Sequence, residues 1–187
     1  MRHLGSVFTL LLALAAAPPA FSQAPAAAPA APAMTMTTTG FPDGGQIPLR
    51  FSQAQPGAAP GEGTSPPLAW ANAPAGTKSF VLHMHDLEAA RNKTTEDQLH
   101  WLVWNIPETA KGLPEGVAKG SKLADGSRQI SATGPFHHYV FEVFALDTML
   151  PVEPTDDPFA TRVNVLAAIQ GHVLGKAVYM GLFRRPN

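Results

Sequence analysis

The chain of 187 residues contains no cysteine. This absence excludes a lipid anchor on an N-terminal cysteine, and it requires the folded protein to be stable without disulfide bonds. Charge is also scarce, because charged residues make up 14% of the sequence and the formal net charge is -1. Such a composition provides no strongly basic surface that would attract nucleic acid, and no acidic tail, so we expect no nucleic-acid partner.

Familiar catalytic motifs are missing as well. The sequence has no P-loop, no GxGxxG motif and no HExxH helix, which removes the usual evidence for nucleotide binding or a zincin-type site. Neither Ser65 nor Ser131 lies in a GxSxG elbow or another recognisable nucleophile context. We therefore expect a binding module with no catalytic residues, and a hydrolase is the less favoured alternative.

The N-terminal apolar run is short. Arg2 precedes the run over residues 4–17, which is too short and too rich in small residues for a stable membrane span, and a small-x-small cleavage site follows. We predict a signal peptide over residues 1–24 and a Pro/Ala linker over residues 25–33. The folded domain is then residues 34–187, exported to the periplasm or secreted, with no transmembrane span in the mature chain.

The predicted domain is mostly β. Runs of β-branched and aromatic residues, separated by Gly/Pro-rich connections, predict strands over residues 34–39, 46–52, 78–86, 100–106, 137–146 and 176–184. Residues 54–67 and 108–128 are expected to be long loops. At this length the chain can bury one sizeable core, so the pattern predicts a β-sandwich with a short helix near the C-terminus.

Only one segment has convincing helical periodicity. Asp156 and Asp157 can cap its start, Pro158 suits the first turn, and Gly171 follows its end. The apolar face of this helix is predicted to consist of Phe159, Val163, Leu166 and Ala167.

Three predicted strands carry an ionisable group at one end of an apolar face. Side chains alternate between the two faces of a strand, so Asp86 shares a face with Phe80, Leu82 and Met84, and His137 shares a face with Tyr139. His100 begins a third strand, where we expect its face to continue through Leu102, Trp104 and Ile106. If the three ends converge, they form a small polar site at the edge of the core.

The order of motifs resembles a known family. SPPLAW (residues 65–70), APAGTKSFVLHMHD (73–86), HWLVWNIP (100–107), GPFHHYVFEVFALDT (134–148) and GHVLGKAVYMGLF (171–183) follow one another. This order is similar to that of the phosphatidylethanolamine-binding protein (PEBP) family, in its bacterial Raf-kinase-inhibitor-like branch (YbhB/YbcL type). The resemblance covers residues 34–187 and implies a β-sandwich with a small C-terminal helix, in which Trp70 is structural.

The resemblance also implies a function. The family binds small anions and phosphate-bearing or zwitterionic head groups in a shared pocket, whose members here would be Asp86, His100, Gly134, His137 and Tyr139. An imidazolium and a phenol can donate hydrogen bonds to phosphate oxygens. Asp86 can orient a histidine or accept a hydrogen bond from the ammonium group of an ethanolamine.

The chain departs from the family pattern at two places. The sequence Asp-Leu-Glu-Ala-Ala over residues 86–90 replaces the usual Asp-Pro-Asp-Ala-Pro and keeps only the spacing of the acids. The loop before His137, which normally supplies backbone donors to the anion, looks shortened over residues 131–139. We therefore expect a more open and weaker site.

Other assignments remain open from the sequence. The pocket could instead receive an acidic or phosphorylated segment of a protein partner, which would make the protein an inhibitor or interaction protein. Exposed edge strands leave a homodimer open. Asp86 could be a metal ligand in either of two sets. One set contains Asp86, His83 and His85, although both histidines lie on the opposite strand face. The other set contains Asp86, His100 and His137. Neither is favoured, so no metal or cofactor is expected.

Overall fold

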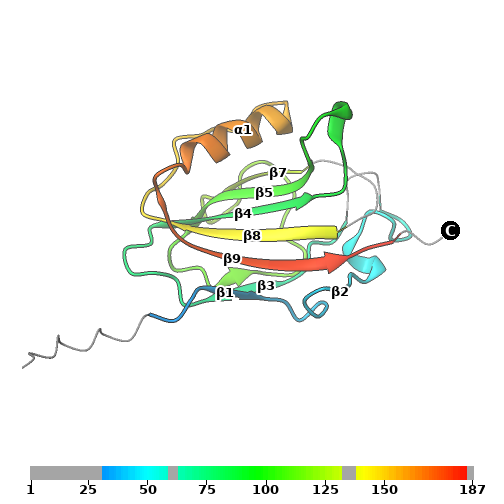
Figure 1. Ribbon diagram of the computed structural model, residues 1–187, viewed down its shortest axis with the longest axis horizontal. Helices are drawn as coiled ribbons and strands as arrows, with labels where there is room; N and C mark the ends of the chain where they lie inside the picture. The colour runs from blue at the N-terminus through cyan, green and yellow to red at the C-terminus, as the bar shows by residue number, and fades with distance from the viewer. Residues whose placement is uncertain (1–30, 59–62, 132–137, 185–187) are drawn as a thin grey trace, which may run out of the picture. The chain divides into compact units, whose positions relative to one another are not determined.

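The protein is a two-sheet structure with one α-helix in its described part. A computed structural model describes residues 31–58, 63–131 and 138–184 (Figure 1), and the residues from Pro32 onward form one compact unit. The predicted β-sandwich with a short helix near the C-terminus is confirmed. No helix in these ranges is long and apolar enough to cross a membrane.

The larger sheet has six strands in the order β2-β9-β8-β4-β5-β7. Their bounds are Gly45–Gln46, Val173–Leu182, His138–Leu146, Ser79–Asp86, Gln98–Pro107 and Arg128–Ser131, in that order. Neighbouring strands are antiparallel except for β2, which runs parallel to β9. The long central strands β4 and β8 therefore carry their side chains side by side along most of their length.

The smaller sheet has three strands in the order β1-β3-β6, with bounds Thr35–Thr37, Leu68–Ala71 and Gly112–Leu113. Its apolar side chains pack against the larger sheet to form the main core, in which the rings of Trp70 and Phe80 lie 5.2 Å apart. The indole Nε1 of Trp70 donates a hydrogen bond to the carbonyl of Ala110 at 3.1 Å. Trp70 is buried between the sheets, which is consistent with a structural role.

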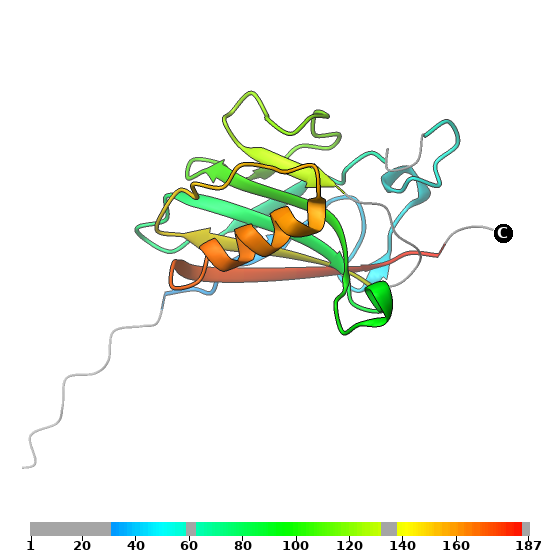
Figure 2. The same cartoon turned by 90° about the horizontal axis from the view of Figure 1, so that it is seen from above.

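The opposite face of the larger sheet is covered in part by helix α1, Pro158–Ala168 (Figure 2). The helix packs on β5 and β7, where Val165 joins Leu102 and Trp104 in a second apolar cluster. Asp157 caps the helix as predicted, because its carboxylate accepts a hydrogen bond from the backbone N–H of Phe159 at 2.8 Å.

The predicted apolar face of α1 was only half correct, because Phe159 and Leu166 pack against the second apolar cluster but Val163 does not. Val163 is 59% exposed, and the buried residues within the helix are Thr161, Arg162 and Val165. The predicted face left out Val165 and gave no inward position to a polar or charged residue. The helix instead turns the long stem of Arg162 inward, where its guanidinium pairs with Asp97.

Two features of the strand pattern were also misjudged. Residues 46–52 do not form one strand, because β2 ends at Gln46 and a 3-10 turn, η1, follows at Leu49–Phe51. The sequence analysis also missed the strands β3, β6 and β7, none of which exceeds four residues. Such short runs carry too little alternation to stand out from loops.

Strand β5 contains an irregularity that moves His100 to the opposite face. Met84 pairs with Trp101 but His85 pairs with Leu99, so His100 is an extra residue in the ladder. The predicted common face of His100, Leu102 and Trp104 was therefore wrong. Leu102 and Trp104 belong to the cluster beneath α1, while the His100 ring lies beside Tyr139 of the main core.

Candidate functional site

Three of the five residues predicted to bind ligand come together at one end of β4, β5 and β8. Asp86 ends β4 and is directly paired with Tyr139 of β8. The Nε2 atom of His100 lies 3.9 Å from the Oδ2 atom of Asp86, and the rings of His100 and Tyr139 have centroids 4.7 Å apart. The register of the central strands thus brings a carboxylate, an imidazole and a phenol into one place. The role of these groups in ligand binding stays a prediction.

The other two predicted residues, Gly134 and His137, lie outside the described residues. Within the described part of the site, the Asp86 side chain is fully buried and His100 keeps 11% of its side chain exposed. Tyr139 is 7% exposed, and its ring meets that of Phe183 edge to face at 6.4 Å. The three polar groups therefore lie beside the main core and are almost fully buried.

The second acid of the Asp-Leu-Glu segment has a structural partner that the sequence analysis missed. Asp86 accepts a hydrogen bond from the backbone N–H of Glu88 at 2.9 Å, which closes a local turn. The Oε2 atom of Glu88 in turn accepts from the backbone N–H of His138 at 2.9 Å and lies 2.6 Å from its Nδ1 atom. Glu88 thus ties the end of β4 to the start of β8.

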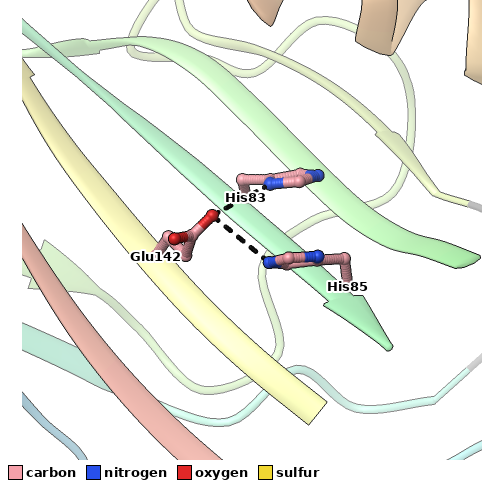
Figure 3. A group of neighbouring side chains, drawn as sticks. All are labelled: His83, His85 and Glu142. Carbon is pink, nitrogen blue, oxygen red and sulfur yellow. Dashed lines mark hydrogen bonds and ion pairs between the residues drawn. The ribbon is translucent and has the colours of Figure 1, made fainter. Parts of the chain in front are cut away.

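A second polar cluster lies on the opposite face of the same strands (Figure 3). His83 and His85 of β4 are stacked, with ring centroids 4.2 Å apart, and both face Glu142 of β8. The Oε2 atom of Glu142 lies 3.4 Å from Nδ1 of His83 and 3.2 Å from Nε2 of His85. Both histidines are buried, while Glu142 is half-buried.

Further charged groups surround this cluster. The Nδ1 atom of His85 lies 2.5 Å from Oδ2 of Asp97, whose other oxygen accepts from the guanidinium of Arg162. The ammonium group of Lys176 pairs with Oε1 of Glu142. Two carboxylates, two imidazoles and two cations are therefore joined across β4, β8, β9 and α1.

The pKa values within the cluster diverge. Burial lowers the pKa of His83 below its ordinary value, and hydrogen bonding to Glu142 offsets this only in part. Burial also acts on His85, but hydrogen bonds to Glu142 and Asp97 outweigh it and raise its pKa. Burial would raise the pKa of Glu142, yet its contacts with His83, His85 and Lys176 hold that pKa far below the usual range. The pKa values of the two neighbouring imidazoles are thus shifted in opposite directions.

The described part of the chain is a β-sandwich in which an acid, a histidine and a tyrosine meet at one end of adjacent strands. A family model for phosphatidylethanolamine-binding proteins matches residues 37–184. The chain belongs to this family, as the order of motifs in the sequence indicated.

Comparisons with individual proteins agree. The UPF0098 protein of Methanothermobacter thermautotrophicus is 38% identical over 164 residues, which cover 81% of this chain and 99% of the relative. A solved structure of Escherichia coli YbcL, a member of the mammalian PEBP family, has a TM-score of 0.64 and 28% identity over 81% of this chain and 98% of that chain. The putative PEBP homologue CT736 of Chlamydia trachomatis has a TM-score of 0.61 and 27% identity over 82% and 99%.

Proposed function

We propose that the protein is an exported binding protein that holds a small phosphate-bearing or zwitterionic ligand, such as a phospholipid head group, at Asp86, His100 and Tyr139. The observation that carries the proposal is the convergence of these three side chains at one end of three adjacent strands. Membership of the phosphatidylethanolamine-binding protein family supports it. Gly134 and His137 are assigned to the same site by their place in the sequence motif.

Each group has a chemical part in this proposal. A protonated His100 donates a charge-assisted hydrogen bond to a phosphate oxygen, and the hydroxyl of Tyr139 adds a neutral donor. Asp86 keeps the imidazole in place and accepts from an ammonium group when the ligand carries one. Because the site is small and borders solvent, the dissociation constant should lie between about 10 micromolar and about 1 millimolar.

Calorimetric titration of the full chain with phosphoethanolamine and with inorganic phosphate tests the proposal. Saturable binding that is lost in His100→Gln and weakened in Tyr139→Phe supports it. His172→Gln is the matched control, since His172 is an exposed histidine that is also paired with a carboxylate, Asp147. Absence of heat with either ligand in the folded wild-type protein would refute the pocket and direct attention to the protein surface.

A phosphorylated or acidic protein segment would be recognised by the same donors. A phosphoserine peptide in the titration therefore tests whether a protein partner is the true ligand. If the peptide binds at least about tenfold more tightly than phosphoethanolamine, a difference of about 1.4 kcal/mol, the interaction role replaces the head-group role.

Export is part of the proposal and has its own test. N-terminal sequencing of the protein recovered from the periplasm or medium should show the chain beginning near residue 25, as the predicted cleavage site implies. Recovery of the intact N-terminus only in the cytoplasm would contradict export.

A further inference from the structure

We propose that His83, His85 and Glu142 form a binding site for one divalent transition-metal ion of the zinc type. The three side chains come from β4 and β8 (Figure 3). They lie on the strand faces opposite to those of Asp86 and Tyr139, so the two proposed sites share no side chain. The three residues each present one ligand atom, and these atoms all lie within 4.8 Å of one another. Among the described residues, no other group of three or more potential ligands meets this spacing.

The distances suit a tetrahedral ion. Zinc binds imidazole nitrogen at about 2.0 to 2.1 Å and carboxylate oxygen at about 2.0 to 2.2 Å, so two ligand atoms in a tetrahedral site lie about 3.3 to 3.5 Å apart. The Oε2 atom of Glu142 lies 3.4 Å from the nitrogen of His83 and 3.2 Å from that of His85. These two distances between ligand atoms are therefore already close to those in a tetrahedral zinc site.

The ligand types fit as well. Two imidazoles and one carboxylate are a set used for zinc with a fourth position open to water or substrate, and the same set suits non-haem iron(II). The sequence alone suggested Asp86 as the third ligand beside His83 and His85. Asp86 points to the main core, whereas Glu142 shares the face of both histidines and is directly paired with His83 across β4 and β8.

Asp97 supplies the support that metal-bound histidines usually have. Such histidines donate the second ring N–H to a carboxylate, which fixes the tautomer and the orientation of the ring. Here Nδ1 of His85 lies 2.5 Å from Asp97, so the neutral ring would carry its proton on Nδ1 and direct a free lone pair from Nε2 toward Glu142. Asp97 is itself held by the buried Arg162 of α1.

One oxygen of Glu142 faces both imidazoles, and part of the neighbouring strand surface is exposed to solvent. Lys176 occupies only Oε1 of Glu142, while both imidazoles face Oε2. Helix α1 packs over β5 and β7 and leaves the β9 side of this face uncovered, where Val178 is 48% exposed.

Zinc titration of the full chain, stripped of metal with a chelator, tests the site by calorimetry. The expected result is one zinc ion per chain, with affinity lowered by about 100-fold or more in His83→Gln and in Glu142→Gln. Asp97→Asn, which removes only the carboxylate behind His85, should cost about 10-fold to 100-fold. His172→Gln is the matched control, and it should leave zinc affinity unchanged.

A second measurement keeps the test decisive if a buried variant fails to fold. Cobalt(II) bound to the wild-type chain should give the intense visible absorption of a tetrahedral ion, and zinc should displace it. Failure to bind zinc, unchanged affinity in both His83→Gln and Glu142→Gln, or the weak spectrum of an octahedral hydrated cobalt ion would each overturn the proposal. The cluster would then be a network of buried ion pairs.

Discussion

Asn105 forms two hydrogen bonds with the backbone of Leu150, a residue far along the chain. Its Nδ2 donates to the Leu150 carbonyl at 2.9 Å, and its Oδ1 accepts from the Leu150 N–H at 2.7 Å. Asn105 is buried and has a positive φ of 57°, a conformation that asparagine tolerates better than most residues. One side chain thus fixes the strand β5 to the segment that leads into α1.

Asn105→Ala should therefore be strongly destabilising. The loss of two hydrogen bonds, at about 1 kcal/mol each, adds to about 1 kcal/mol for alanine at a positive φ. We expect denaturant unfolding to show a loss of about 3 kcal/mol. Asn72→Ala is the control, because Asn72 has the same φ of 57° but is exposed and donates one bond to Ala33. Equal losses in both variants would contradict the importance of the Leu150 contact.

Glu88→Ala should weaken anion binding more than it weakens the fold. The contact between Glu88 and His138 is half-exposed, and such pairs contribute about 1 kcal/mol or less to stability. His138 directly follows the proposed ligand-binding residue His137, so we expect phosphate affinity to fall by about fivefold, equivalent to about 1 kcal/mol. Glu96→Ala, which removes an exposed partner of Arg91, should change neither quantity. Unaltered phosphate affinity in Glu88→Ala would show that this tie does not position the site.

Asp86→Asn should lower the affinity for zwitterionic ligands but not the affinity for simple anions. Asparagine keeps an oxygen that can accept from the N–H of Glu88, so the turn should persist. The loss of the negative charge should weaken phosphoethanolamine by about tenfold, within the range for a hydrogen bond to a charged group. Inorganic phosphate should bind equally well or better in a parallel titration. Equal weakening of both ligands would mean that Asp86 acts only by orienting His100.

Anion binding should be stronger at about pH 6 than at about pH 8, since histidine changes its charge between these values. Sulfate is the appropriate probe, because its own charge is constant over this range and the titration reports the protein alone. The pH dependence should persist in the control His172→Gln and be reduced in His100→Gln. A flat profile in the wild-type protein would exclude an imidazolium donor.

The sequence was sufficient for the features that depend on local pattern. Alternation of apolar residues identified β4, β5 and β8 and placed Tyr139 and Glu142 on opposite faces of β8. Asp157 was recognisable as a helix cap because capping is a short-range interaction. The order of motifs was sufficient to indicate the family, which the family match confirmed.

Relationships between strands required the tertiary structure. The extra residue His100 in β5 depends on pairing with β4, so alternation alone assigned its face wrongly. The contacts of Glu142 with His83 and His85, and of Asp97 with His85 and Arg162, depend on strand register and on the packing of α1. Alternation along the chain was enough to assign the faces of β4 and β8, where the side chains follow a regular pattern. Which side chains meet depends on the packed structure, because register and bulges are set by contacts between segments distant in the chain.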